Sequence, residues 1–188
     1  MELDQHWAFR TDFDAGFWCC VILPQRMDEI MNVISDTLTS FFAQEDWAVT
    51  KGEDGPPNRF FVPFQGENGQ WTCVALALDT QEQMIFYSVV PVPCPEDKRT
   101  AMMDFLHRVN YGLHVGNFEF DIEDGEIRFK TSVDVEGCAF DAALCRNAIF
   151  MNCVMMDHHL PGIMGIIYGA LTPVDALQKI RTAPAATS

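Results

Sequence analysis

The side chains best suited to bind a metal ion lie together near the C-terminal end of the chain. Asp157, His158 and His159 follow closely after Cys153. Neighbouring histidines on a helix point about 100° apart, which hinders a shared ion. A zinc site also needs more ligands than this segment supplies. We therefore interpret these residues as a polar stretch before Pro161, and we expect no metal and no cofactor.

Other reactive patterns are equally incomplete. The acidic turn at residues 121–126 carries its glycine one position too early for a calcium-binding loop. Cys19 and Cys20 are adjacent, but no nearby histidine or lysine would activate either thiol. The sequence has no glycine-rich phosphate loop, no nucleophile elbow and no helical His-Glu zinc motif. We therefore expect a protein that is not an enzyme.

The composition excludes further classes of function. The chain has 188 residues, with 27 Asp and Glu against 12 Lys and Arg, so its formal net charge is −15. This charge repels phosphate backbones and anionic lipids, so we expect no binding to nucleic acid or to a membrane. It would suit basic or amphipathic partner segments. Hydrophobic residues make up 48% of the sequence, which is enough for one sizeable core.

The N-terminal sequence lacks the pattern of a secretory signal. Its apolar run at residues 16–23 is short, and Asp12 and Asp14 precede it where a signal peptide carries positive charge. The seven cysteines are an odd number without a compact framework, which indicates thiols kept reduced. These features together predict a cytoplasmic protein.

An aromatic-rich arm, residues 1–24, precedes the first helix. No helical or alternating pattern organises its large side chains, which are Trp7, Phe9, Phe13, Phe17 and Trp18. Such side chains are unfavourable in water, so we expect residues 1–23 to dock on their own domain or on a dimer mate. Two interpretations stay open: a fixed extension that completes the core, and an autoinhibitory segment that occupies a binding surface.

The remaining pattern predicts one main domain over residues 25–170, followed by a short helix and a disordered tail over residues 171–188. An amphipathic helix follows Pro24, with apolar residues from Met27 to Phe42 at helical spacing. The later elements are strands at residues 47–50, 59–65, 71–78 and 84–90, a helix near 95–112, strands at 115–123 and 126–135, and a long helix at 140–169. The strands at 71–78 and 84–90 are apolar on both faces, so we expect them to be central and covered.

The last two strands are expected to form a hairpin with Asp124-Gly125 as a two-residue turn. This register places apolar pairs on one face and opposite charges on the other. The pairs are Ile122 with Ile127, Phe120 with Phe129, Asp121 with Arg128, and Glu119 with Lys130.

The predicted helices are rich in methionine, a flexible side chain that suits surfaces with varied apolar partners. The long helix carries more apolar residues than one buried stripe needs, which predicts a homodimer. Pro161 and Gly162 are expected to kink or break this helix. The residues that we select as a partner-binding or dimer surface are Met102, Ile149, Phe150, Met151, Met155 and Met156.

Four segments carry a resemblance to a known family. They are Arg108-Val109-Asn110-Tyr111-Gly112, Gly116-Asn117-Phe118-Glu119-Phe120-Asp121, Asp124-Gly125-Glu126-Ile127-Arg128-Phe129, and the stretch from Leu160-Pro161 to Ile167-Tyr168-Gly169. Together with the order of the elements, they make residues 25–170 resemble the YbjN-like family, which is described as bacterial sensory-transduction regulators.

The resemblance implies the α+β fold of type III secretion chaperones, small dimers that hold unfolded segments of partner proteins. The expected order is α-β-β-β-α-β-β-α, with an antiparallel β-sheet packed with helices. The resemblance supplies no catalytic residues, and it implies a non-enzymatic, cytoplasmic peptide-binding chaperone or a regulatory adaptor. The alternative is a small-ligand sensor with a pocket between the sheet and the helices, and an uncharacterised enzyme comes third.

Overall fold

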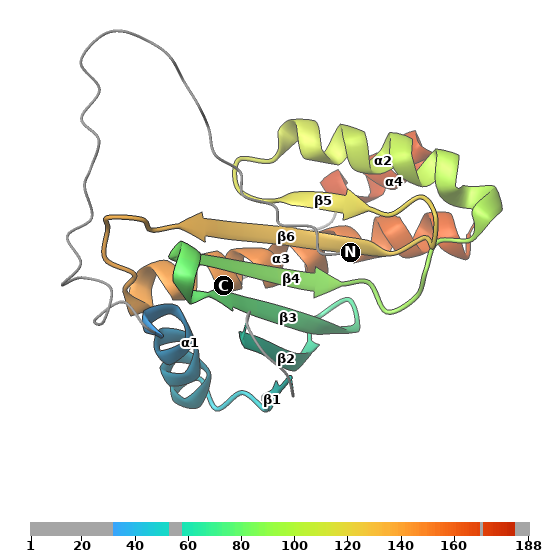
Figure 1. Cartoon of the computed structure of the whole chain (residues 1–188). Helices are drawn as coiled ribbons and strands as arrows, with labels where there is room; N and C mark the ends of the chain where they lie inside the picture. The colour runs from blue at the N-terminus through green and yellow to red at the C-terminus, as the bar shows by residue number, and fades with distance from the viewer. Residues whose placement is uncertain (1–31, 53–57, 170, 183–188) are drawn as a thin grey trace, which may run out of the picture.

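The computed structural model describes residues 32–52, 58–169 and 171–182, in which four α-helices pack against one six-stranded antiparallel sheet (Figure 1). The predicted α+β class is confirmed. The helices are α1 (Val33–Gln44), α2 (Arg99–Gly112), α3 (Ala142–Ile167) and α4 (Pro173–Thr182). The strands are β1 (Thr50–Lys51), β2 (Asn58–Gln65), β3 (Gln70–Leu78), β4 (Gln83–Val89), β5 (Asn117–Phe120) and β6 (Ile127–Asp134). Two short 3-10 helices are labelled η2 (Asp79–Gln81) and η3 (Glu96–Lys98).

The strands pair in the order β1-β2-β3-β4-β6-β5. β1 to β4 form a meander, after which the chain crosses as α2 to the far edge, forms β5 and returns as β6 beside β4 (Figure 1). β3 and β4 are therefore central, as predicted. The strand expected at residues 47–50 is reduced to the two residues of β1, which pair only with Phe60 and Phe61 of β2. Pro63 lies beyond that pairing, at an open edge where a missing N–H costs nothing.

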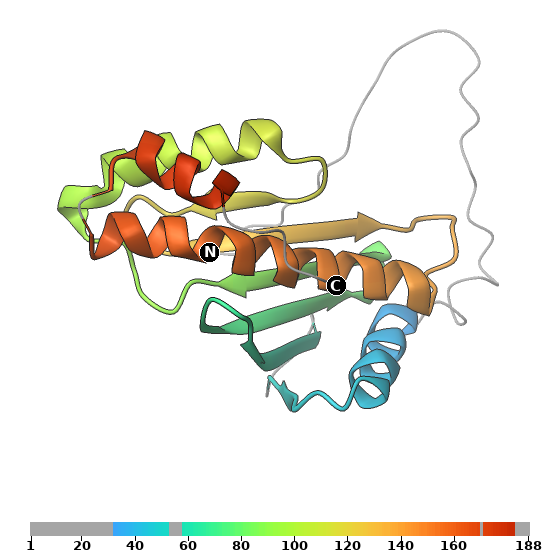
Figure 2. The ribbon, with the colours of Figure 1, turned by 180° about the vertical axis from the view of Figure 1, so that it is seen from behind.

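α3 runs across one face of the sheet, against β4 and β6 (Figure 2). α1 packs beside it over β3, α2 packs along β5, and α4 packs on α2 and α3. The hydrophobic core fills the space between this helical layer and the sheet, because every second side chain of β3 and β4 is buried there. No helix in the described part of the chain is long and apolar enough to cross a membrane.

The β5–β6 hairpin forms, but in a register different from the predicted one. Glu119 pairs with Arg128 and Phe118 with Phe129, two residues away from the pairing through a tight Asp124-Gly125 turn. A shift of two residues leaves every side chain on its own face. The alternation of apolar and charged residues is therefore the same in both registers, and it could not distinguish them.

Backbone contacts explain the longer connection between β5 and β6. The Asp121 N–H donates to the Glu126 carbonyl at 2.9 Å, and the Gly125 N–H donates to the Asp121 carbonyl at 2.9 Å. Gly125 has a φ of 85°, which favours glycine. Its carbonyl accepts a hydrogen bond from the Cys94 N–H at 2.8 Å, so the segment between β4 and α2 holds the turn in place.

α3 continues through Pro161, so the predicted break of the long helix does not occur. A proline has no N–H, which deprives the carbonyl of Asp157 of its helical donor. The Nδ2 of Asn68, in the β2–β3 loop, donates to that carbonyl at 3.2 Å. The same Nδ2 and the Asn68 N–H donate to the Asp157 carboxylate at 3.1 Å and 2.8 Å. The loop thus replaces the bond that the proline removes.

The first turn of α1 is capped by a residue that lies far away in the sequence. Asp79, at the start of η2, accepts hydrogen bonds from the N–H groups of Ile34 and Ser35 at 2.9 Å and 3.1 Å. The Ser35 hydroxyl also donates to this carboxylate. α1 therefore begins at the end of the sheet where β3 gives way to η2.

The predicted arm at residues 1–24 lies outside the described residues, together with Cys19 and Cys20. The same holds for the part of the predicted first helix that precedes residue 32, and for the predicted tail after residue 182. Between residues 171 and 182 the chain forms α4, whose Ala176 and Ile180 are buried in the core.

Candidate binding surface

Half of the residues selected as a partner or dimer surface are core residues instead. Met102, Ile149 and Met156 are fully buried, so they form no exposed surface of this chain. Ile149 and Met156 are buried because α3 has the sheet beneath it and packs against α1, α2 and α4 as well, so its additional apolar residues serve the core. Met102 is buried on α2, which packs against β5, α3 and α4. The other three selected residues are exposed or half-buried, and they are Met151, Phe150 and Met155.

A continuous apolar surface lies on the face of the sheet opposite α3. Strand register places its side chains next to one another: Phe61, Val74 and Tyr87 form one row across three strands, and Leu76 lies beside Ile85 in the next. These side chains alternate with the buried ones and are only partly covered. We call this surface the open sheet face and define it by Phe61, Val74, Leu76, Ile85, Tyr87 and Val89.

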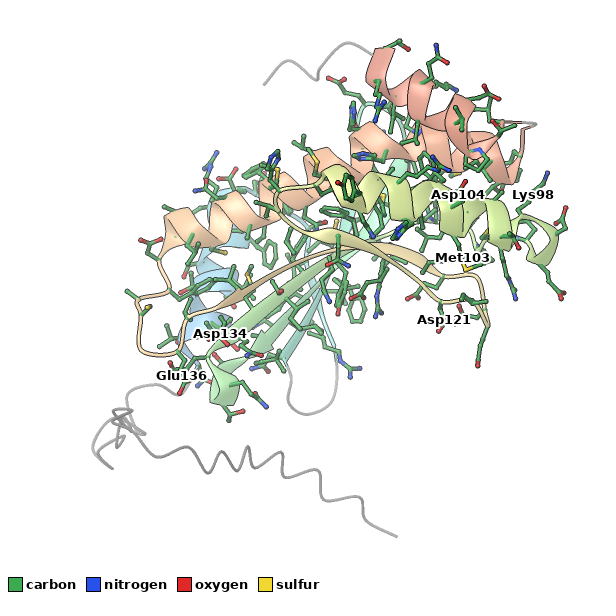
Figure 3. All side chains as sticks on the ribbon, turned by 90° about the horizontal axis from the view of Figure 1, so that it is seen from above. Lys98, Met103, Asp104, Asp121, Asp134 and Glu136 are labelled. Carbon is green, nitrogen blue, oxygen red and sulfur yellow. The ribbon has the colours of Figure 1, made fainter. Side chains whose placement is uncertain are left out.

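The described helices leave this face uncovered. Figure 1 looks directly onto it, with α3 behind the strands. Figure 3 shows α3 along one side of the strands, with Asp121 and Asp134 at opposite ends of the β5–β6 hairpin. Phe61 is 38% exposed, which is a large fraction for a phenylalanine in a paired strand. The expectation that the central strands are covered on both faces is therefore wrong for the described residues.

An ion-pair network borders the open sheet face on the β6 side. The Nε of Arg128 lies 2.8 Å from Oε2 of Glu119, and Lys130 binds the other oxygen of the same carboxylate. Partial burial would raise the pKa of Glu119, but hydrogen bonds from Lys130 and Arg128 lower it below its usual value. The guanidinium of Arg128 also lies 4.4 Å from the ring centre of Tyr87, within cation–π range.

The charge of this border differs from that of the chain as a whole. Arg59, which neighbours Leu76 in the register, forms no ion pair within the described ranges. Against a formal net charge of −15, the residues directly beside the face in the strand register are cationic: Arg59 pairs with Leu76, Lys130 with Tyr87 and Arg128 with Val89. The carboxylates of Glu119, Glu126 and Asp134 lie one position further out.

The buried polar residues of α3 make structural contacts. Asn152 is fully buried, and its Nδ2 donates to the carbonyls of Phe86 and Phe129 at 2.9 Å and 3.1 Å. Asp157, expected in a polar stretch, is buried against the β2–β3 loop, and His159 is buried as well. Within residues 32–52, 58–169 and 171–182, no three His, Cys, Asp or Glu side chains are grouped as metal ligands would be.

The reactive potential of the described cysteines is limited by burial. Cys73, Cys94, Cys145 and Cys153 are buried, and Cys138 is exposed. Desolvation raises the pKa of the Cys145 thiol to about 12, which keeps it protonated. The Sγ of Cys73 lies 3.4 Å from the hydroxyl of Ser88 inside the core. The four buried thiols are therefore core residues, and Cys138 lies at the surface.

Two shallow grooves lie away from the interface between the sheet and the helices. One, of about 310 Å³, follows the outer side of the β2–β3 hairpin from Pro63 to Thr72. The other, of about 500 Å³, lies between α2 and α4 and is lined by His107, Arg108 and Arg181, among others. Neither is the pocket between sheet and helices that a small-ligand sensor was expected to have.

Sequence reasoning missed the open sheet face because β3 and β4 are apolar on both sides. The available signal was in the neighbouring strands. In β6, Arg128 and Lys130 alternate with buried residues, and in β2 Arg59 precedes the buried Phe60 in the same way. Charged residues at alternate positions indicate a face in contact with water.

Comparison with known proteins assigns the chain to a family. A search of curated proteins found none that matches it. Residues 35–149 match the YbjN family, whose description is "Putative bacterial sensory transduction regulator". The match begins within α1 and ends within α3, so it includes all six strands of the sheet. Because it extends over more than half of the 188 residues, the chain belongs to the YbjN family.

Proposed function

We propose that this protein is a cytoplasmic, non-enzymatic regulatory adaptor that binds an extended segment of a partner protein on the open sheet face. The description of its family as regulators of sensory transduction supports a regulatory role. The observation that carries the proposal is the contiguous row of partly exposed apolar residues, Phe61, Val74 and Tyr87, on a face that no described element covers.

The chemistry of this face defines the segment that fits it. Its centre accepts aromatic and aliphatic side chains, whose burial supplies most of the affinity. Its cationic border at Arg59, Lys130 and Arg128 favours carboxylates near those apolar residues, because opposite charges steer and orient the encounter. The preferred segment is therefore aromatic and acidic, in contrast to the basic partner that the net charge of the chain alone suggests.

The test uses two sets of short fluorescent peptides with identical aromatic residues, one set bearing Asp and Glu and the other Lys. We expect the acidic set to bind more tightly, with an advantage that shrinks as salt is added. Replacing Leu76→Ser together with Tyr87→Ser should weaken binding about tenfold or more, because both side chains lie at the centre of the face. The matched control is Val174→Ser, an exposed apolar residue of α4 that should leave binding unchanged.

Two outcomes would contradict the proposal. The first is that neither peptide set binds the full-length protein, and that neither binds a variant whose N-terminal arm carries Phe13→Ser, Phe17→Ser and Trp18→Ser. The second is that peptides bind, but with an affinity that Leu76→Ser and Tyr87→Ser do not change.

The sensor alternative has one specific observation in its favour. The groove between α2 and α4 combines Arg108 and Arg181 with Tyr111, which is 93% exposed. Two guanidinium groups and an aromatic ring could hold a small aromatic anion. A rise in melting temperature with such an anion, abolished by Arg181→Ala, would favour the sensor over the adaptor.

A further inference from the structure

The open sheet face has a candidate occupant within the same chain. We propose that residues 1–23 dock on the open sheet face and that a partner segment must displace them. This inference rests on the proposed function, because it assigns the regulation of the same surface.

Hydrophobic complementarity is the first argument. The face presents Phe61, Tyr87 and four aliphatic side chains in register across β2, β3 and β4. Residues 1–23 hold five large aromatic side chains, which are Trp7, Phe9, Phe13, Phe17 and Trp18. Each surface is unfavourable in water, and docking would bury both at once.

Charge complementarity is the second argument. Residues 1–23 contain four carboxylates, at Glu2, Asp4, Asp12 and Asp14, against one Arg, Arg10, and no Lys. Three cations, Arg59, Lys130 and Arg128, lie directly beside the face in the strand register, and Arg59 is in no ion pair within the described ranges. The carboxylates of Glu119, Glu126 and Asp134 lie one position further out. The arm thus has the aromatic and acidic character that the face selects.

The third argument is that the position of α1 lets residues 1–23 reach the open sheet face. α1 lies in the helical layer and begins against Asp79, where β3 ends, so its first residues are at one end of the sheet. Residues 24–31 could span up to about 26 Å if extended. Crossing from β3 to β6 requires only about 10 Å, since neighbouring strands lie about 4.8 Å apart. Tethering at this distance gives an effective concentration in the millimolar range, so even weak docking competes with a partner.

The first experiment maps the contact in the full-length chain. The photoreactive residue p-benzoylphenylalanine replaces Tyr87 or, in a second variant, Phe61, and the cross-linked peptides are identified by mass spectrometry. We expect cross-links from both positions to residues 1–23, and none from the matched control position, Val174 on α4. Mixing isotope-labelled and unlabelled chains separates contacts within one chain from contacts with a second copy. Cross-links absent from both positions on the face, or formed only between chains, would overturn the proposal.

The second experiment tests displacement. The full-length variant with Phe13→Ser, Phe17→Ser and Trp18→Ser should bind the acidic aromatic peptides about tenfold more tightly than the unchanged chain, because the competing arm is weakened. Equal peptide affinity in both chains would overturn the inference while leaving the proposed function intact. Peptide binding absent from both would instead count against the proposed function. If the variant fails to unfold cooperatively, the arm completes the core, and the inference of a displaceable segment is wrong.

Discussion

His159 is a buried histidine that is held neutral by its surroundings. It is 6% exposed, its Nδ1 lies 2.7 Å from the carbonyl of Met155, and its ring packs edge-on against Phe118. Since a carbonyl can only accept, Nδ1 carries the proton. Burial is the main reason why the pKa of His159 falls from 6.5 to about 4, and the neighbouring His158 lowers it further.

This shift predicts a loss of stability in mild acid. Between pH 6.5 and pH 4 the unfolded chain binds a proton at His159 that the folded chain does not, so the free energy of unfolding decreases as the pH falls. We expect His159→Phe to remove about 3 kcal/mol of this decrease, measured by urea unfolding at several pH values. The control substitution is His107→Gln, at an exposed position of α2. An unchanged profile in His159→Phe would show that His159 titrates normally.

The register of the β5–β6 hairpin can be tested by double-mutant cycles. The observed pairing predicts a coupling of about 0.5–1 kcal/mol between Glu119→Gln and Arg128→Gln, because these side chains form a partly exposed ion pair. The rejected tight turn would instead couple Asp121 to Arg128. We therefore expect Asp121→Asn and Arg128→Gln to change the free energy of unfolding additively. Coupling between Asp121 and Arg128, with none between Glu119 and Arg128, would show that the register predicted from the sequence is correct.

At the scale of secondary-structure elements, the β2–β3 loop and α3 depend on each other. Pro161 removes a helical hydrogen bond, and Asn68 supplies a substitute at the Asp157 carbonyl while it also binds the carboxylate. Gly66 allows the close approach, because a Cβ there would lie 2.2 Å from Oδ1 of Asp157. A proline within a helix is thus accommodated by a loop residue, Asn68, that lies 89 residues before Asp157 in the sequence.

Asn68→Ala should destabilise the fold by about 1–3 kcal/mol, because the buried Asp157 loses two side-chain hydrogen bonds. Part of this loss should disappear in a Pro161→Ala background, where the helix regains its own donor for the Asp157 carbonyl. The control is Gln65→Ala in the same hairpin, whose exposed side chain should contribute less than about 0.5 kcal/mol. The free energy of unfolding is measured by urea unfolding. If Asn68→Ala and Gln65→Ala lowered it equally, the docking role of Asn68 would be refuted.

These elements show which features could be predicted from the sequence. The α+β class and the central strands follow from local periodicity and turn residues. The hairpin register and the uninterrupted α3 do not, because Cys94 fixes the first and Asn68 permits the second from distant parts of the chain. Three of the six residues selected as a partner or dimer surface are buried for a related reason, because an apolar helix in the centre of a fold is covered from several sides.

For the molecule as a whole, the structure separates a helical layer from an open sheet face. The exposed apolar residues of α3, Met151 and Val154, lie on the helical side, 40% and 45% exposed. Because these two side chains are exposed, we still predict a homodimer, with its interface on the outer side of α3. The peptide site is proposed on the opposite side, so one surface can be occupied without the other.

Light scattering at micromolar concentration should give a mass about twice that of one chain. Met151→Glu with Val154→Glu should yield the monomer, because two buried carboxylates are unfavourable in an apolar interface. Val174→Glu, on α4, is the matched control and should preserve the dimer. A monomeric mass for the unchanged protein would disprove the dimer.

The distant cap of α1 has a consequence for synthesis on the ribosome. The residues of α1 emerge well before Asp79, which caps the helix, and before α3, against which it packs. A helix of 12 residues without cap or packing is marginal in water. Leu38, Phe41 and Phe42 therefore stay accessible while most of the chain is still being made. For that time, the nascent chain exposes an apolar segment of the kind that chaperones bind.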